Sequence, residues 1–244
     1  MIHTFTDFGP NGPYLGQMIA VLRRLAPEVP VIDLLNDAPA FESRLSAYLL
    51  AALMARIEPS DIVLAIVDPG VGTARQPLAI EVDGRWLVGP DNGLFELVLR
   101  RAESARTHAI AWRPVELSPS FHGRDLFAPV AADLARGQTA KLAPASPRRF
   151  ADWPDDLAAI VYVDRYGNAM TGMRAEAMPE DGTLRVGADC LARARVFGEV
   201  PPGQAFCYVN ALGLIEIAMN GASAAERLGL SLGMSVTPGH QARA

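Results

Sequence analysis

The sequence predicts an α/β protein, with an N-terminal α/β domain around a largely parallel sheet and a small, barrel-like all-β domain after it. Two observations carry this prediction. Short apolar runs of strand type alternate with helical patterns through the first part of the chain, and such alternation favours a parallel sheet covered by helices. Further on, the apolar runs are short and are separated by Gly and Pro, which is typical of a small β-barrel or sandwich.

The elements of the N-terminal part follow one another closely. The continuous apolar run DIVLAIV, bounded by Asp61 and Asp68, predicts a strand that is covered on both faces. Asp83-Gly84 predicts the turn of a hairpin. In chain order we expect strand 2–5, helix 14–25, strand 30–35, helix 42–56, strand 61–67, hairpin strands 77–82 and 85–88, and helices 93–99 and 126–136.

A change in composition near residue 140 predicts a domain boundary. The stretch KLAPASPRRFADWPDD holds three prolines and shows no periodicity. We therefore expect an N-terminal domain of residues 1–140, a linker of residues 141–157 and a C-terminal domain of residues 158–244. The strands expected in the C-terminal domain are 158–163, 183–186, 206–210, 214–219 and 234–236.

Composition excludes several classes of protein. Half of the 244 residues are hydrophobic and the net charge is −5, which allows a sizeable core and argues against a nucleic-acid partner. The two cysteines lack metal-ligand spacing, so free thiols in a reducing compartment are expected. The N-terminus lacks the pattern of a signal peptide, and the most apolar stretch, Leu45 to Ala55, is shorter than the ~20 residues of a membrane span. We expect a cytoplasmic protein without membrane contact.

Four polar segments stand at the ends of apolar runs. Asp7 follows the first predicted strand and Asp68 the third, and ligands of open α/β sheets bind beyond the carboxyl ends of strands. Pro and Gly around Asp68 predict a tight turn that a ligand can approach closely. The segments are TDFG at 6–9, DPGVGTAR at 68–75, PDNGLF at 90–95 and FHGRD at 121–125.

Each segment also has an ordinary structural interpretation. Asp7 and Asp68 are typical caps of turns and strand ends, Arg75 is typical of a surface charge, and a lone His122 is more often structural than catalytic. PDNG at 90–93 fits a turn with a helix cap as well as it fits a site. The glycine-rich turn lacks the signatures of phosphate and dinucleotide loops. A metal between Asp68 and His122 is disfavoured because a nearby arginine would repel the cation.

Taken together, the segments resemble the S-adenosyl-L-methionine (SAM) hydroxide adenosyltransferases, also called SAM hydrolases. DPGVGTAR and FHGRD form the most specific pair, and the resemblance covers essentially the whole chain. The other matching segments are TDFG at 6–9, PYLGQM at 13–18, PDNGLF at 90–95, DRYGN at 164–168 and LGLIEIAMNGASAAERLG at 212–229. The family is related to the fluorinase and chlorinase enzymes, which attack the same carbon of SAM with halide.

The resemblance implies a catalytic set of Asp68, Arg75 and His122 around an attacking water. In the halide-using relatives the aspartate position is not acidic and the histidine is replaced, so retention of both favours water. The implied reaction is attack of water on C5′ of SAM, giving adenosine and L-methionine without a cofactor or metal. The implied assembly is a homotrimer, with each site between the N-terminal domain of one subunit and the C-terminal domain of its neighbour.

The resemblance also implies substrate contacts. Asp7 maps onto the ribose diol, Asp164 onto the methionine ammonium, and Asn168 offers a donor and an acceptor to the adenine edge. Ala224 maps near a backbone contact to adenine. Phe41 occupies an aromatic position that packs on the substrate in relatives, and an ordinary core role fits it equally well.

Three departures from the family pattern concern the methionine end of the pocket. Ala211 stands where a hydroxyl would contact the methionine carboxylate, Gly172 replaces an asparagine, and Gly12 replaces an acidic residue. None of them touches Asp68, Arg75 or His122. We therefore expect altered affinity and an intact reacting centre.

The chemistry explains why these residue types belong together. The sulfonium is a good leaving group, whereas bulk water, with a pKa near ~15.7, attacks poorly unless it loses a proton. Without a metal, a carboxylate or an imidazole must accept that proton. We expect Arg75 to hold Asp68 ionised, which makes it a weaker base. Alignment, worth ~7–11 kcal/mol in good cases, then supplies more of the rate, and the sequence leaves the proton acceptor open.

Two rival functions stay open at this point. One is a halide-using SAM enzyme, which would form 5′-halo-adenosine. The other is a non-catalytic protein that binds SAM or adenosine tightly and forms no product.

Overall fold

The computed structural model describes residues 1–240 and divides the chain into two compact units. The first runs from Met1 to Phe150, and the second begins at Ala151. The boundaries expected from composition stay a prediction, but one short strand lies inside the expected linker. Residues Leu142–Pro144 form strand β7, which pairs with β6 (Ala105–Ile110) as part of the first unit.

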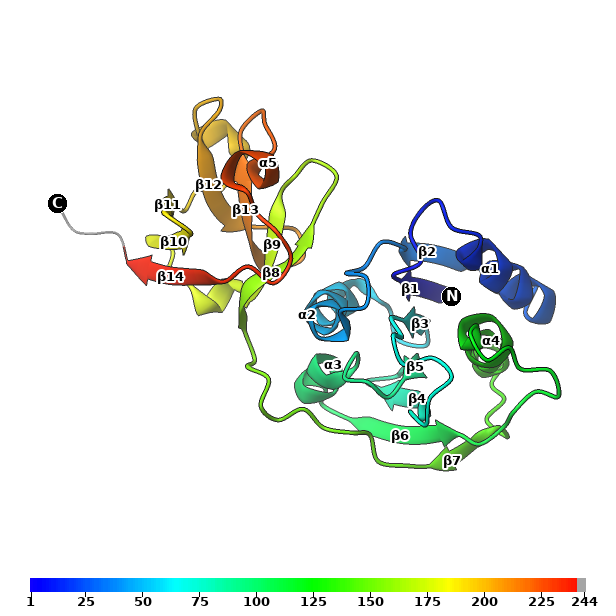
Figure 1. Cartoon of the computed structure of the whole chain (residues 1–244). Helices are drawn as coiled ribbons and strands as arrows, with labels where there is room; N and C mark the ends of the chain where they lie inside the picture. Colours follow the sequence, from blue (N-terminus) through cyan, green and yellow to red (C-terminus); the bar gives the residue numbers. More distant parts are fainter. Residues whose placement is uncertain (241–244) are drawn as a thin grey trace. The chain divides into compact units, whose positions relative to one another are not determined.

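A seven-stranded sheet forms the centre of the first unit (Figure 1). Its order is β2-β1-β3-β5-β4-β6-β7, in which β2, β1, β3 and β5 run parallel and the last three pairings are antiparallel. The bounds of the other five strands are β1 (Ile2–Thr6), β2 (Val31–Leu35), β3 (Ile62–Ile66), β4 (Pro77–Val82) and β5 (Arg85–Pro90). Parallel strands need crossover connections, and the helical segments 14–25 and 43–53 supply them between β1 and β2 and between β2 and β3.

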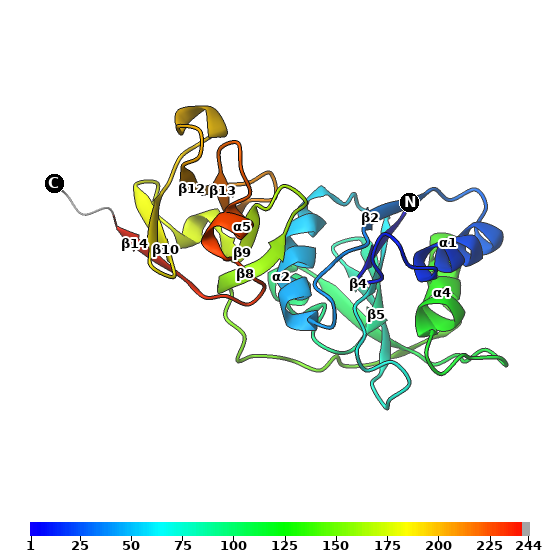
Figure 2. The ribbon, with the colours of Figure 1, turned by 45° about the horizontal axis from the view of Figure 1, so that its top comes forward.

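Helices cover both faces of this sheet. Figures 1 and 2 show α1 (Tyr14–Leu25) and α4 (Ala128–Ala135) together on one face, and Figure 1 shows α2 (Ser43–Leu53) and α3 (Glu96–Arg101) on the other. A 3₁₀ turn, η1 (Met54–Arg56), extends α2, and one turn of π-helix, η2 (Gly123–Phe127), precedes α4. Every residue of β3 is buried, as its continuous apolar run predicts. The core on the α1 side contains Met18, Leu22, Leu64, Ile66, Phe127 and Val130.

The strand register brings three chain segments to one edge of the sheet. Thr6, the last residue of β1, lies opposite Ile66, the last residue of β3, and β5 runs parallel on the other side of β3. The backbones approach closely here, since a Cβ at Gly89 would lie 2.2 Å from the Ala65 carbonyl oxygen. The segments after β1, β3 and β5 therefore leave the sheet side by side.

The second unit consists mainly of two antiparallel sheets, of order β11-β10-β14 and β12-β13-β9-β8. Its core includes Ile160, Leu184, Cys207, Ile215 and Ile217. The elements are β8 (Leu157–Val163), β9 (Ala169–Arg174), η3 (Ala175–Ala177), β10 (Gly182–Val186), β11 (Asp189–Ala192), η4 (Phe197–Glu199), β12 (Ala205–Val209), β13 (Leu214–Met219), α5 (Ala224–Leu228) and β14 (Val236–His240). The predicted fold class, a mostly parallel α/β part followed by an antiparallel β part, is confirmed.

Within residues 1–240, none of the helices has both the length and the apolar character needed to cross a membrane.

Candidate active site

A small cleft lies at the sheet edge where β1 and β3 end. Its volume is about 130 Å³. Asp7 reaches it directly after β1, Asp68 comes two residues after β3, and His122 precedes the π-helical turn η2. Phe41 and the aromatic side chains of Phe8 and Phe121 complete much of the wall. Four of the residues expected from the sequence therefore meet in one cleft.

Arg75, which does not line the cleft, connects Asp68 and His122. Its Nε lies 2.8 Å from Asp68 Oδ1 and 2.9 Å from Oδ2, and its Nη2 also bonds Oδ2. The same Nη2 lies 3.2 Å from His122 Nδ1. The Asp68 and Arg75 side chains are only 5% and 9% exposed. The three expected catalytic residues thus form one connected set in which a single guanidinium fixes both partners.

The bond from Arg75 determines which hydrogen His122 carries. An arginine has only donors, so His122 Nδ1 must accept, and the neutral ring then carries its hydrogen on Nε2. Burial, followed by the positive charge of Arg75, lowers the pKa of His122 below its ordinary value. His122 is therefore a neutral imidazole near pH 7, with a donor at Nε2.

The turn after Asp68 is what brings Arg75 back to it. Val71 N–H donates to the Asp68 carbonyl oxygen over 3.2 Å, and Thr73 donates to the Gly70 carbonyl oxygen through both its N–H and its hydroxyl. Gly72 has φ +79°, and a Cβ there would lie 2.6 Å from the Pro119 carbonyl oxygen. Only glycine fits this position, which explains the second glycine of the Gly70-Val71-Gly72 segment.

Asn92 gives the PDNG segment a structural role next to the site. Its Nδ2 donates to the carbonyl oxygen of Val67, the residue before Asp68, over 2.7 Å. Its Oδ1 accepts from Leu94 N–H, and its own carbonyl accepts from the Ser43 hydroxyl. The sequence left turn and site equally open for this segment. The structure makes it a turn whose side chain fixes the backbone at Asp68.

Asp7 and Phe41 are connected through the backbone. Phe41 N–H donates to Asp7 Oδ2 over 3.1 Å, and burial raises the pKa of Asp7. Phe41 has φ +64° and its side chain is 76% exposed. This exposure rules out the core role for Phe41, because a core aromatic would be covered. A strained backbone that holds an aromatic ring open beside a cleft is typical of a functional position.

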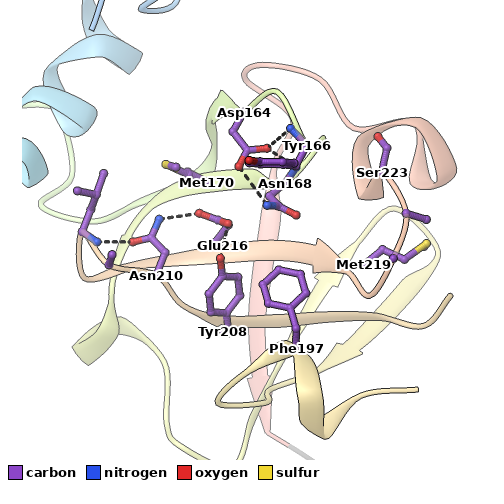
Figure 3. Close-up of a pocket in the computed structure, with 14 residues that line it drawn as sticks. Asp164, Tyr166, Asn168, Met170, Phe197, Tyr208, Asn210, Glu216, Met219 and Ser223 are labelled. Atoms are coloured by element: carbon purple, nitrogen blue, oxygen red, sulfur yellow. Dashed lines mark hydrogen bonds between the residues drawn. The ribbon is translucent and has the colours of Figure 1, made fainter. Parts of the chain in front are cut away.

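The C-terminal unit contains a second and larger cavity of about 750 Å³ (Figure 3). Asp164 and Asn168 line it. Asp164 Oδ1 accepts from the N–H groups of Tyr166 and Asn168, and its Oδ2 accepts from Asn168 Nδ2. Ala224 lies fully buried at the start of α5, next to Ser223, which does line the cavity. The expected recognition residues of the C-terminal part are thus gathered at this second cavity.

The residues that depart from the family pattern occupy different places. Ala211 lines the large cavity, and Gly172 pairs with Leu157 between β9 and β8. Gly12 lies so close to the backbone that a Cβ would be 2.8 Å from the Phe8 carbonyl oxygen. An acidic residue at position 12 would therefore require the loop to shift.

The donor set at the small cleft does not suit a metal ion. Arg75 occupies the position between Asp68 and His122 where a cation would sit. Across residues 1–240, no group of three or more His, Cys, Asp or Glu residues is placed to hold one. The cleft is therefore suited to chemistry performed by its own side chains.

Sequence reasoning missed a polar group inside the large cavity. Tyr208, Asn210 and Glu216 line it together with Asp164. The signal was present in LIEIAM, where one glutamate interrupts an otherwise apolar strand. A charged residue in such a position is buried whichever face the strand presents, and buried charges are rare unless they have a function or a partner.

Comparisons with known proteins converge on one family. The sequence model of the SAM hydroxide adenosyltransferase N-terminal domain matches residues 2–143, and that of the C-terminal domain matches residues 158–237. An (R)-S-adenosyl-L-methionine hydrolase from Thermus thermophilus is 40% identical over 96% of this chain and 98% of its own length. A fluorinase from Actinopolyspora mzabensis is 24% identical over 97% of this chain and 96% of its own.

A solved structure agrees with this relationship. An uncharacterized conserved protein from Thermotoga maritima superimposes with a TM-score of 0.88 at 28% identity. The match covers 98% of this chain and the whole of that chain. The similarity therefore extends over both units.

Proposed function

Because this chain belongs to the SAM hydroxide adenosyltransferase family, it hydrolyses SAM to adenosine and L-methionine, and we propose that Asp68, Arg75 and His122 hold the attacking water. One observation carries the residue assignment. Arg75 fixes both the Asp68 carboxylate and the His122 ring beside a cleft that has room for little more than a water and part of a ligand. SAM enters as the substrate, and its sulfonium supplies the leaving group without a cofactor.

The reaction needs one bond to form and one to break. The water oxygen forms a bond to C5′ while the C5′–S bond breaks, and the electron pair goes to sulfur, which becomes the neutral thioether of methionine. The water proton must leave as the bond forms. His122 Nδ1 already accepts from Arg75, and Nε2 carries the ring hydrogen. We therefore propose that a free lone pair of the Asp68 carboxylate accepts the proton. His122 Nε2–H donates a hydrogen bond to the water oxygen and so helps to position it.

Orientation contributes more than basicity in this proposal. Two guanidinium nitrogens of Arg75 hold the Asp68 carboxylate. The same contacts lock its direction, and so the water that it binds points along the line of attack. Well-aligned reactions gain up to ~7–11 kcal/mol from such positioning.

The recognition roles follow the two cavities. Asp7 accepts the hydrogen bonds of the ribose diol, and the exposed Phe41 ring packs on the substrate. Asp164 binds the methionine ammonium, Asn168 the adenine edge, and the backbone at Ala224 the adenine as well. These assignments are supported by the placement of Asp7 and Phe41 in the small cleft and of Asp164 and Asn168 in the large one.

The sizes of the cavities support a site shared between subunits. Pockets that enclose a drug-sized ligand have volumes of roughly 300–1,000 Å³, and the catalytic cleft has only about 130 Å³. We propose that the chain forms a homotrimer in which the C-terminal unit of a neighbouring subunit completes each catalytic cleft.

The activity is tested by incubating the purified protein with SAM and quantifying products. Because the Thermus relative is named for the (R) epimer, both sulfonium epimers are assayed separately. Adenosine and methionine released in equal amounts are expected. Formation of 5′-halo-adenosine in chloride or fluoride would favour a halide enzyme instead. Tight SAM binding with no adenosine after hours would favour a binding protein and contradict the proposal.

The shared site is tested by co-expressing Asp68→Asn and Asp164→Ala and measuring kcat/KM, which the first change lowers through kcat and the second through KM. In a closed ring of subunits, random mixing leaves about one quarter of interface sites with both halves intact. Recovery of about that fraction of wild-type activity is expected. Complete inactivity of mixed oligomers, shown to form by differently tagged subunits, would place the whole site within one chain.

A further inference from the structure

Glu216 is a charged residue in a place where charge is costly. It is the one ionisable residue of β13, whose six residues are all buried, and it is only 2% exposed. It lies opposite Tyr208 of β12 and Met170 of β9, and all three line the large cavity. Carboxylates are almost never buried this deeply unless they are paired. The structure must therefore supply partners or a use for the charge.

The partners of Glu216 are neutral. The Tyr208 hydroxyl donates to Oε1 over 2.6 Å and Asn210 Nδ2 donates to Oε2 over 2.7 Å, and Figure 3 shows the Asn210 bond on the face of the cavity. Asn210 cannot turn its amide round, because its Oδ1 accepts from the N–H groups of Leu212 and Leu214. Asn210 thus fixes Oε2 as an acceptor, and the hydrogen bonds from Asn210 and Tyr208 both favour the ionised form of Glu216.

A second carboxylate lies in the same cavity. Asp164 also accepts only from neutral groups, the N–H groups and the amide of its own turn. Among the described residues that line the cavity there is no Lys, Arg or His. Burial and then the charge of Asp164 act to raise the pKa of Glu216. Two like charges at one cavity repel each other, and a cation bound between them would relieve this cost.

We propose that Glu216 determines the charge selectivity of this cavity, so that it binds the positively charged substrate in preference to the uncharged products. The proposal rests on the proposed function, which places the ligand here. SAM carries a sulfonium, an ammonium and a carboxylate, and its net charge is +1. Adenosine is uncharged and methionine is a zwitterion of net charge zero. A cavity with surplus negative charge therefore favours SAM and releases both products.

A simpler role would be to tie β12 to β13 through the Tyr208 bond. The two roles differ in which ligands they affect. Loss of a strand connection would weaken every ligand of the cavity alike, whereas loss of the charge would weaken cationic ligands alone. Tyr208→Phe removes the bond and keeps the charge, and Glu216→Gln removes the charge and keeps the shape.

The test measures dissociation constants by calorimetry for SAM, S-adenosylhomocysteine and adenosine, in an Asp68→Asn background that suppresses turnover. Glu216→Gln is expected to weaken the binding of SAM by on the order of tenfold. The affinity for S-adenosylhomocysteine, which lacks the sulfonium charge, is expected to fall less, and the affinity for adenosine is expected to stay unchanged. Tyr208→Phe is expected to leave the ratio of SAM to adenosine affinity intact. If the Gln variant does not fold, the double variant Glu216→Met/Tyr208→Phe carries the same expectation.

Three outcomes would overturn the proposal. Glu216→Gln could leave the SAM affinity unchanged, or it could weaken the binding of all three ligands equally. Tyr208→Phe could change the ratio of SAM to adenosine affinity as much as Glu216→Gln does. Failure of the proposed function looks different. A wild-type protein that releases no adenosine from SAM would refute the activity, while the affinity ratio would still report on Glu216.

Discussion

The two cavities of this protein treat buried carboxylates in opposite ways. In the small cleft, where we propose that catalysis takes place, Asp68 is paired with Arg75, and the guanidinium also fixes His122. In the cavity of the C-terminal unit, Asp164 and Glu216 accept only from neutral donors. The first arrangement cancels charge and fixes direction. The second keeps negative charge available to a ligand.

This difference separates the two tasks that the reaction requires. A group that positions water must hold one orientation, and a charge-assisted bidentate pair provides that. A group that attracts a cationic substrate must keep an uncompensated charge, and neutral donors permit that. Changes in the cleft should therefore lower kcat, and changes in the large cavity should raise KM.

The largest effect is expected for Asp68→Asn. The variant keeps the size of the side chain but removes the proposed proton acceptor and the charge that holds Arg75. We expect kcat to fall by about 10²–10⁴ with little change in KM. Steady-state kinetics measure this, and an unchanged Tm serves as the control for folding. Near-wild-type turnover in a folded variant would remove Asp68 from the mechanism.

Asp164→Asn should produce the opposite pattern. It leaves the turn intact through the N–H groups of Tyr166 and Asn168, but it removes the charge. Hydrogen bonds to charged groups contribute about 1.5–3 kcal/mol, so KM should rise by roughly 10- to 100-fold at nearly constant kcat. If kcat falls and KM stays constant, the division of tasks between the cavities is wrong.

The pH dependence tests the neutral state of His122. Its pKa is lowered by burial and by Arg75, so the ring gains its proton only at a pH below about 6.5. Protonation removes the acceptor at Nδ1, and we expect kcat/KM to fall by up to about tenfold per pH unit there. The unfolded chain binds this proton more readily, and so stability also rises with pH across the window. In His122→Asn, the fall of kcat/KM and of Tm at low pH should disappear. If the fall persists in this variant, another group is responsible for it.

The smallest effect is expected for Asn92→Ala. The variant loses the donor to Val67 and leaves the Asp68 side chain in place. A neutral hydrogen bond contributes about 1 kcal/mol, which corresponds to roughly a fivefold fall in kcat. Ser43→Ala, which removes only the bond to the Asn92 carbonyl, is the matched control and should change kcat less. Equal kinetics in both variants and the wild type would mean that Asn92 acts on stability alone.

The sequence predicted the elements whose hydrophobic pattern is strong. Helix α1, the fully buried strand β3 and the hairpin at Asp83-Gly84 all form where expected. Strands β6 and β9 were missed. Half of the residues of β6 are polar and only its last residue, Ile110, is buried, and β9 contains Gly172. Helix α3 was expected from residue 93 but begins at Glu96, because Asn92 Oδ1 captures Leu94 N–H in a local turn.

The site was predictable in part for a different reason. Short motifs identify Asp68, Arg75 and His122, because each stands in a distinctive local sequence. The bond between Arg75 and His122 joins residues 47 positions apart, and it depends on how the π-helical turn meets the sheet edge. The role of Glu216 depends on which strands flank β13. The spacing of residues along the chain shows neither the Arg75–His122 bond nor the surroundings of Glu216, so neither could be inferred before the fold was known.

We propose that water attacks C5′ of SAM at the Asp68 cleft. A turnover in ¹⁸O-labelled water, with mass spectrometry of both products, tests it most directly. We expect one ¹⁸O atom in the 5′-hydroxyl of adenosine and none in methionine. Unlabelled adenosine, or labelled homoserine together with methylthioadenosine, would show that the oxygen enters elsewhere and would contradict it.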